Sequence, residues 1–191
     1  TQPIFILSSG RSGTQMMEKL ISTNPLVEIH HEYLCNIIQP LGTKFYMGLV
    51  HHEQVVETIR QTYAAAVYYC NKPLWIDSSN KLSWIIPGLI DVFPQAKFVH
   101  IVRDGRRVAS SYFNKLADEC YEPECVRALA DFVIGKDMIA PPPEKKYWWP
   151  LENQETRALN SFCSLSQFEQ ISRHWQIIND TISVSLTAVP D

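Results

Sequence analysis

A stretch of eleven residues near the start of the chain decides the fold: Ile4-Phe5-Ile6-Leu7-Ser8-Ser9-Gly10-Arg11-Ser12-Gly13-Thr14. Its first four residues are apolar and do not alternate with polar ones, which is typical of a strand buried within a parallel sheet. A turn rich in glycine and serine follows, and apolar residues at helical spacing begin after Thr14. The stretch therefore predicts a strand, a tight turn and a helix in succession.

The same alternation of strand and helix continues along the chain. Short apolar segments followed by polar loops predict further strands at residues 27–29, 74–76 and 97–102. Helices are expected between them, including one over residues 53–69. This pattern indicates an α/β fold: a P-loop-like parallel β-sheet flanked by helices on both faces. The carboxyl edge of such a sheet would bring together the loops at residues 8–14, 30–32, 77–81 and 103–111.

The second half of the chain carries weaker signals. A helix is expected at residues 125–135, and Tyr147-Trp148-Trp149 is expected to pack against the domain, with the lip of a binding site as the alternative. Apolar residues from Phe162 to Ile182 step by three and four, which predicts one long amphipathic helix. Two expectations concern burial: residues 97–102 should be the clearest buried strand, and His174 should be half-exposed.

Composition bounds the class of protein. The 191 residues include 46% hydrophobic and 19% charged residues, a balance that fits one globular domain rather than a disordered chain. The formal net charge of -3 argues against a generally basic nucleic-acid-binding protein. No apolar run approaches the roughly 18 residues that a membrane span requires. We therefore expect neither a nucleic-acid partner nor a membrane segment in this chain.

The five cysteines are odd in number and lack the C-x2-C spacing of a zinc site. They predict free thiols in a reducing compartment, and hence a cytoplasmic location. Two observations keep a secretory compartment open. Cys120 and Cys125 are close enough in sequence to bridge a short loop, and the abrupt ends at Thr1 and Asp191 resemble those of a fragment.

The turn after the first strand has the residues of an anion-binding loop. Gly10 and Gly13 permit positive φ angles and a close approach of the backbone to a ligand. We expect the amides of Ser12, Gly13 and Thr14 to point into the turn, where the helix dipole favours an anion. Arg11 adds a cation that can bind two oxygens at once. The turn is not a Walker A sequence, because it lacks the G-x-x-x-x-G-K-[ST] pattern.

A second candidate anion site follows residues 97–102. Arg103 comes directly after that segment, and Ser111 lies eight residues later, about two turns into the next expected helix. An arginine and a serine hydroxyl at this separation can hold one phosphate between them. The alternative is a cationic helix start that is balanced by Asp104.

Together these motifs resemble those of the sulfotransferases that use 3'-phosphoadenosine 5'-phosphosulfate (PAPS). The R-S-G-T form of the turn looks closest to the tyrosylprotein and bacterial branch of that family. The resemblance implies PAPS as co-substrate, with its 5'-phosphosulfate on the turn and its 3'-phosphate on the second motif. The residues implied for binding it are Ser9, Gly10, Arg11, Ser12, Gly13, Thr14, Arg103 and Ser111.

The resemblance also bears on the extent of the domain. Members of the family continue past a tryptophan-bearing helix, here around Trp175, into another strand with an acidic segment and a nucleotide lid. Neither feature can be found in this chain. We therefore expect residues 1–191 to form a single sulfotransferase-like domain that lacks its C-terminal strand and lid.

Transfer to an acceptor hydroxyl needs a general base, and the resemblance points to Glu32, with His31 as the second candidate. Arg11 and Lys81 are the candidate catalytic cations, the alternative for Lys81 being an ordinary surface lysine. Sulfate carries less charge than phosphate, so fixed cations can replace a metal, and we expect no metal site. The acceptor is expected to be a hydroxyl of a small molecule, a sugar or a peptide.

Two other functions stay open from the sequence. A P-loop kinase or NTPase-like enzyme would use the turn as a degenerate phosphate loop, and a non-catalytic module would bind a nucleotide without chemistry. A magnesium-dependent NTPase also needs an acidic residue after a hydrophobic strand. Residues 97–102 are followed by Arg103 instead.

Overall fold

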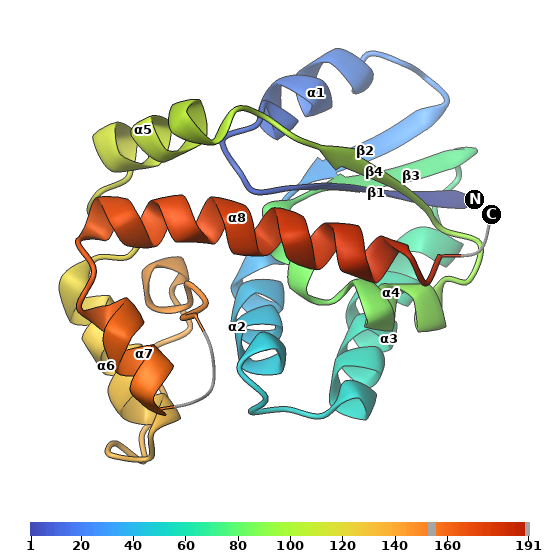
Figure 1. Ribbon diagram of the computed structural model, residues 1–191. Helices are drawn as coiled ribbons and strands as arrows, with labels where there is room; N and C mark the ends of the chain where they lie inside the picture. The colour runs from blue at the N-terminus through green and yellow to red at the C-terminus, as the bar shows by residue number, and fades with distance from the viewer. Residues whose placement is uncertain (153–155, 190–191) are drawn as a thin grey trace.

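The computed structural model describes residues 1–152 and 156–189, and its centre is a four-stranded parallel sheet. The strands are β1 (Gln2–Ser8), β2 (Val27–His31), β3 (Leu74–Ser78) and β4 (Lys97–Ile101), in the order β2-β3-β1-β4. β1 lies between β3 and β4, with Ile4 opposite Ile76 on one side and Lys97 on the other. The predicted α/β fold with a parallel sheet is confirmed (Figure 1).

Helices cover both faces of the sheet (Figure 1). They are α1 (Thr14–Ile21), α2 (Cys35–Tyr46), α3 (His52–Tyr68), α4 (Ile86–Val92), α5 (Gly105–Lys115), α6 (Pro123–Val133), α7 (Thr156–Cys163) and α8 (Gln167–Leu186), with short 3-10 helices η1 (Asn80–Trp84) and η2 (Lys145–Tyr147). On one face, α1 packs its Met17 and Ile21 against a cluster that includes Ile6 of β1. On the other face, α3, α4 and α8 bury Phe5 and Leu7 of the same strand.

The unbroken apolar run of β1 follows from this position. Phe5 and Leu7 are fully buried on one face, and Ile6 is 3% exposed on the other. Successive side chains of a strand point to opposite faces, so a strand covered on both faces needs apolar residues at every position. The continuous apolar sequence of β1 therefore matches its position in the interior of the sheet.

β4 is one of the two edge strands of the described sheet, the other being β2, and it pairs with β1. Its residue Val99 is 42% exposed, and Lys97 is exposed as well. The prediction that residues 97–102 form the clearest buried strand is therefore wrong. Apolar composition alone does not distinguish a central strand from an edge strand, because neither composition nor spacing reports how many neighbours a strand has.

The predicted long helix from Phe162 to Ile182 is two helices. α7 ends at Cys163 and α8 begins at Gln167. Ser166 caps α8: its backbone amide donates to the Glu169 carboxylate at 2.8 Å, and its hydroxyl accepts from the Glu169 amide. This reciprocal capping box starts a new helix, although the apolar spacing continues across the break.

A second hydrophobic cluster joins α5, α6 and α8 to the segment that follows η2. Trp148 and Trp149 are buried in it, which confirms that they pack against the domain. His174 is also buried, at 2% exposed, so the expectation of a half-exposed histidine is wrong. Its ring lies 5.3 Å from the Trp149 ring and 6.2 Å from the Tyr112 ring, because α8 is covered on this side by α5 and by the tryptophan segment.

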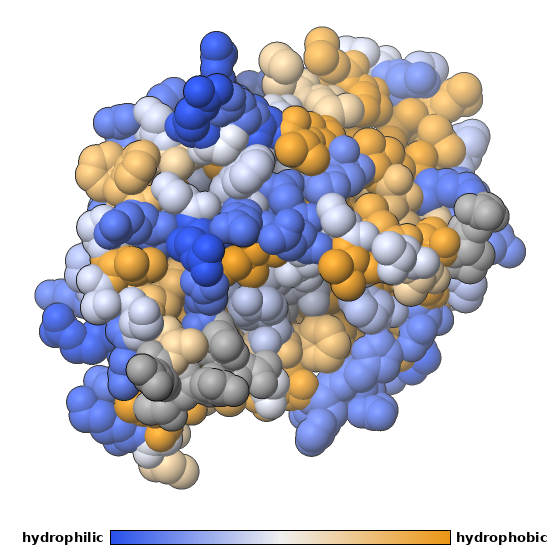
Figure 2. All heavy atoms as spheres, in the orientation of Figure 1, coloured by the Kyte–Doolittle hydropathy of each residue, from blue (hydrophilic) through white to orange (hydrophobic). Residues whose placement is uncertain are grey.

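All five cysteines are free, and Cys120 and Cys125 are both buried. Among the described residues, no helix combines the length and the apolar character that crossing a membrane would require. On the face drawn in Figure 2, hydrophilic residues run along α8.

Candidate active site

Four loops meet at the carboxyl edge of the sheet and line a cavity of about 300 Å³. They are the turn after β1, the segment at the end of β2, η1 after β3 and the loop after β4, as the strand order predicts. The predicted site residues on the cavity wall are Gly10, Arg11, Gly13, Thr14, His31, Glu32, Lys81 and Arg103.

The turn after β1 has the conformation that an anion-binding loop needs. Gly10 and Gly13 have φ angles of 80° and 94°, and Arg11 also lies in the left-handed region with a φ angle of 53°. The Ser12 hydroxyl donates to the Gly10 carbonyl at 3.0 Å and closes the turn. Within the described residues, the backbone amides of residues 11–14 donate to no protein acceptor. These N–H groups are therefore available to an anion at the start of α1.

Tyr112 of α5 fastens the turn from behind. Its hydroxyl donates to the Ser9 carbonyl at 3.1 Å, and a Cβ atom on Gly10 would lie only 1.9 Å from that hydroxyl oxygen. Gly10 is therefore required by close packing as well as by its φ angle. Ser9 is fully buried, so the structure places it behind the turn rather than on the cavity wall.

Arg11 and Arg103 lie side by side, although 92 residues separate them in the sequence. Arg103 Nη1 donates to the Arg11 carbonyl at 2.6 Å, and Arg11 Nε donates to Ser111 Oγ at 3.0 Å. Trp175 of α8 holds the second arginine in place, because its indole N–H donates to the Arg103 carbonyl at 3.0 Å. The two predicted anion motifs therefore occupy one edge of the molecule.

Neither of these two arginines has an acidic partner. Among the described residues, no carboxylate forms an ion pair with Arg11 or Arg103. Arg103 and Ser111 also line an open hollow of about 510 Å³ beside the cavity, together with Arg107 and Lys115. Unpaired guanidinium groups next to free backbone amides favour a bound anion with more than one phosphate or sulfate group.

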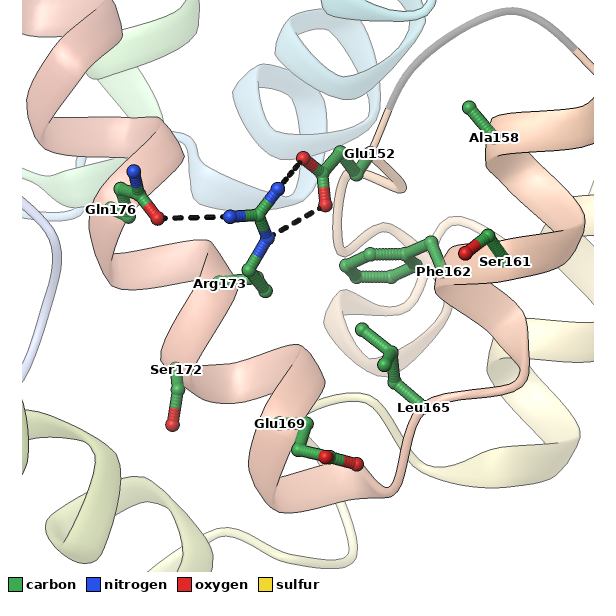
Figure 3. A pocket seen from close by; sticks show the side chains of 9 residues that line it. All are labelled: Glu152, Ala158, Ser161, Phe162, Leu165, Glu169, Ser172, Arg173 and Gln176. Atoms are coloured by element: carbon green, nitrogen blue, oxygen red, sulfur yellow. Dashed lines mark hydrogen bonds and ion pairs between the residues drawn. The ribbon is translucent and has the colours of Figure 1, made fainter.

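A cavity of about 560 Å³ between α7 and α8 shows the contrasting case of a paired arginine (Figure 3). There Arg173 donates from two guanidinium nitrogens to the Glu152 carboxylate, and a third contacts Gln176 at 3.0 Å. Its charge is already satisfied by the protein, and Phe162 and Leu165 form an apolar wall opposite. None of the predicted site residues lies on this cavity, and we assign no role in binding an anion to it.

Glu32 lies at the end of β2 between two lysines. Lys145 Nζ donates to Glu32 Oε2, and Lys81 Nζ lies 3.7 Å from Glu32 Oε1. Burial alone would raise the pKa of the Glu32 carboxyl, but the two lysines hold that pKa below its usual value. Glu32 is therefore ionised at neutral pH, which is the state that can accept a proton.

Lys81 is a buried cation rather than a surface lysine. Its side chain is 6% exposed, and its Nζ lies 4.5 Å from the centroid of the Trp149 ring. Burial lowers the pKa of Lys81, while the nearby Glu32 carboxylate raises it. The aromatic ring and the carboxylate together hold the ammonium group at the cavity wall.

His31 lines the same cavity as its neighbour Glu32. Its Nδ1 lies 2.7 Å from the Ser78 carbonyl, which can only accept, so Nδ1 carries the proton. In the neutral form of the ring, Nε2 is then the acceptor. The structure thus places both candidate bases at the cavity, and two lysines pair with Glu32.

Lys145 is the site residue that the sequence analysis missed. It comes from η2, 113 residues after Glu32, and its carbonyl is anchored by a hydrogen bond from Gln39 Nε2 at 3.0 Å. A lysine between the Pro141-Pro142-Pro143 run and an aromatic segment is a weak signal, since only the tertiary fold brings it to β2. Tyr112, which supports the turn, was missed for the same reason, whereas Trp149 lies on the cavity wall as the alternative interpretation of its segment expected.

Cations dominate the chemistry of the cavity. Within the ranges that the structure describes, no group of three or more His, Cys, Asp or Glu side chains is placed to hold a metal ion. The positive groups on the wall are Arg11, Lys81, Arg103 and Lys145. Metal-independent chemistry therefore stays a prediction that depends on these four side chains.

Comparison with known proteins identifies the class. Residues 3–130 match the family model described as "Sulfotransferase family", which covers both anion motifs as well as Glu32 and Lys81. The chain therefore belongs to the sulfotransferase family and is a sulfotransferase, a class of enzyme that typically uses PAPS. None of the curated proteins compared with the chain matches it. The match does not support the kinase alternative, and it does not distinguish the branches of the family.

Proposed function

We propose that this chain transfers a sulfuryl group from PAPS to an acceptor hydroxyl, with Glu32 as general base. One observation carries the proposal: the cavity that holds Glu32 between two lysines is also bordered by Arg11 and Arg103, and neither arginine pairs with a carboxylate of residues 1–152 or 156–189. A proton acceptor thus lies beside a site for a multiply charged anion. Family membership supports the same reaction class.

The anion-binding side of the cavity fits a donor with charged groups at two positions. The amides of residues 11–14 and the Arg11 guanidinium would hold the 5'-phosphosulfate. Arg103 and Ser111, which already meet through Arg11, would hold the 3'-phosphate. When bound, this donor supplies the sulfuryl group and leaves as adenosine 3',5'-bisphosphate.

Glu32 would take the proton of the acceptor hydroxyl as the acceptor oxygen bonds to sulfur. Its carboxylate is unprotonated despite its burial because the two lysines keep its pKa low, and loss of one lysine contact would make it a stronger base. Of the two lysines that pair with Glu32, Lys145 has the more exposed side chain. Lys145 is therefore the partner that an incoming hydroxyl would displace. His31 is the alternative base at the same position in the site.

Negative charge grows on the oxygen that departs with the bisphosphate, as in phosphoryl transfer. Arg11, Lys81 and the amides of the turn would stabilise that charge without rearranging. Lys81 is held by the Trp149 ring, and the turn is held by Tyr112, so these groups are fixed before the reaction begins.

Binding and transfer can be tested separately. Calorimetric titration with adenosine 3',5'-bisphosphate is expected to show binding well below millimolar concentration, and absence of binding at that concentration contradicts the proposal. Transfer of labelled sulfate from PAPS is then measured with 4-nitrophenol, glucosamine and a tyrosine-containing peptide as acceptors. These three probes cover the phenolic, sugar and peptide hydroxyls that the proposal allows.

The role of Glu32 is tested by Glu32→Gln, which removes the proton acceptor and keeps the shape of the side chain. General-base catalysis typically contributes about 10²–10⁴-fold, so kcat should fall by that factor while bisphosphate affinity stays the same. Glu28→Gln, a carboxylate on the same strand that pairs with His30, is the matched control and should leave kcat unchanged. If His31→Asn rather than Glu32→Gln removes turnover, the base is His31.

A further inference from the structure

A buried carboxylate that the proposed reaction does not use contacts the residue that follows Glu32. Asp77, near the end of β3, is fully buried on the sheet face that also carries Trp75, and Tyr63 of α3 packs against both residues. Burial raises the pKa of Asp77 to about 7, although hydrogen bonds from Tyr63 and from the Tyr33 amide oppose this. A carboxyl group in such surroundings costs stability that an apolar side chain would not. The contacts of Asp77 therefore indicate what role this carboxyl group has.

Those contacts converge on the backbone of one residue, Tyr33. Asp77 Oδ1 accepts from the backbone amide of Tyr33 at 3.2 Å, and Asp77 Oδ2 accepts from the Tyr63 hydroxyl at 2.8 Å. The same hydroxyl lies 3.1 Å from the Tyr33 carbonyl. Asp77 and Tyr63 thus hold both backbone polar groups of the residue that follows Glu32.

Either protonation state of Asp77 keeps its contacts with the Tyr33 amide and the Tyr63 hydroxyl, but the single Tyr63 proton meets either Asp77 or the Tyr33 carbonyl. When the carboxyl is ionised, it accepts from the Tyr33 amide and from the Tyr63 hydroxyl. When it carries a proton, it can donate to Tyr63, which then donates its own proton to the Tyr33 carbonyl. Burial and the neighbouring Asp77 raise the pKa of Tyr63, so its hydroxyl keeps its proton in both cases.

The backbone that these two side chains hold is strained. Glu32 and Leu34, on either side of Tyr33, have φ angles of 56° and 48°, a region that costs about 1–2 kcal/mol for a residue with a Cβ atom. Such conformations persist where the surrounding structure fixes them. The left-handed turn at Glu32 also sets the direction in which its carboxylate leaves the end of β2.

We propose that Asp77 and Tyr63 form a clamp on Tyr33 that fixes the strained turn at Glu32 and thereby aims the general base into the cavity. Both are positioning residues, since neither lines the cavity. The inference rests on the proposed role of Glu32 and goes beyond it. The clamp gives a function to a buried carboxyl group whose burial lowers the stability of the fold.

The decisive test is whether the effect of breaking the clamp depends on Glu32. Asp77→Leu removes both acceptor oxygens and fills the space, and Asp77→Asn keeps an acceptor for Tyr33 and a partner for Tyr63. With whichever of the three acceptor probes is turned over, Asp77→Leu should lower kcat at least about tenfold, the scale of a misplaced catalytic group, and Asp77→Asn should recover most of that loss. Bisphosphate affinity should stay within twofold of the parent chain in both variants.

In a Glu32→Gln background, Asp77→Leu should change kcat less than twofold, because no base remains to be aimed. An equal loss of kcat in both backgrounds means that Asp77 only supports the fold, and overturns the clamp. If Glu32→Gln alone leaves kcat unchanged, the proposed base fails instead, so the two failures are distinguishable.

Tyr63→Phe tests the clamp without altering the carboxylate. It should lower kcat in the same Glu32-dependent way, and a loss that persists without Glu32 would contradict the clamp. Tyr121→Phe is the matched control: Tyr121 is equally buried, but its hydroxyl donates to the Pro150 carbonyl at 2.6 Å and does not touch the Glu32 turn. It should leave kcat within twofold.

Hydrogen exchange gives a readout that needs no acceptor. Exchange of the Tyr33 amide should accelerate at least tenfold in Asp77→Leu and stay slow in Asp77→Asn. The Ser79 amide, which donates to the Ile6 carbonyl at 3.0 Å, serves as the internal reference and should not change. Unchanged protection of Tyr33 in a folded Asp77→Leu variant would overturn the clamp.

Discussion

The two sides of the cavity are built in different ways. The anion-binding side consists mainly of backbone: a turn of residues 9–13 with left-handed φ angles, free amides, and two arginines that follow β1 and β4. The opposite side consists of side chains from distant segments, with Glu32 placed between Lys81 and Lys145. A local motif therefore determines where the donor binds, whereas long-range packing determines the charge state of the base.

The largest expected effect breaks the anion-binding side at its closest contact. Gly10→Ala would place a Cβ atom 1.9 Å from the Tyr112 hydroxyl in addition to straining a φ angle of 80°. We expect bisphosphate affinity to fall about 100-fold or more, because strain and displacement of Tyr112 add together. Titration calorimetry with the bisphosphate measures the change.

Gly13→Ala is the matched control for this substitution. Gly13 has a φ angle of 94°, but a Cβ atom there would meet no other atom within 4 Å. Strain alone, about 1–2 kcal/mol, predicts a loss of roughly 5–30-fold. Equal losses for the two alanine variants would show that the contact between Tyr112 and the turn does not shape the anion site.

This difference between the sides also explains what could be predicted from sequence. Short local patterns identify the anion-binding turn, the strand that precedes it and Arg103. In the turn, Gly10 and Gly13 permit the positive φ angles that its backbone adopts. The parallel sheet follows from the alternation of strands and helices. By contrast, Lys145 could not be placed beside Glu32, since its position depends on the packing of η2 against α2 through Gln39.

Burial was predicted less well than topology, for a related reason. His174 lies in a shell of aromatic rings contributed by α5 and by the segment after η2, and neither can be inferred from the spacing of α8. The edge position of β4 is likewise an outcome of how elements meet. The capping box at Ser166 is instead a local signal, the S-x-x-E spacing from Ser166 to Glu169, which the apolar periodicity obscured. Periodicity reports which face of an element is apolar, but it does not report what covers that face.

A smaller effect is expected on the side of the cavity where Lys81 and Lys145 flank Glu32. Lys145→Met removes one of the two cations that lower the pKa of Glu32, so that pKa should rise. A base must be unprotonated to act, so the acid limb of the kcat profile should move to higher pH. Activity would then be lost at less acidic pH than in the parent chain, while bisphosphate affinity at neutral pH stays within twofold.

Lys146→Met is the matched control, because it removes the charge of the neighbouring lysine without removing a partner of Glu32. Lys146 Nζ lies 5.2 Å from the Tyr147 ring centroid and pairs with Glu144 rather than with Glu32. Its removal should leave the acid limb where it is. Identical profiles for Lys145→Met and the parent chain would show that Lys145 does not influence the base.

The smallest effect concerns stability rather than activity. Burial and the nearby Lys81 lower the pKa of His174 from 6.5 to about 3. Between these two values the unfolded chain binds a proton that the folded chain excludes, so this histidine makes stability fall as the pH drops below about 6.5. His174→Phe should therefore flatten the decline of Tm between pH 7 and pH 4. His52→Asn, which removes an exposed histidine paired with Asp91, should retain the steeper decline.

In the proposed complex one nucleotide bridges the two anion motifs, and titration with two ligands that differ in the 3'-phosphate tests this bridging. The chain is titrated with adenosine 3',5'-bisphosphate and with adenosine 5'-monophosphate, which lacks the 3'-phosphate, before and after Arg103→Ala. A charge-assisted hydrogen bond contributes about 1.5–3 kcal/mol, so the parent chain should prefer the bisphosphate by roughly 10–150-fold. Arg103→Ala should abolish that preference and leave monophosphate affinity unchanged. If the variant still prefers the bisphosphate by the same factor, Arg103 does not bind the 3'-phosphate and the account is contradicted.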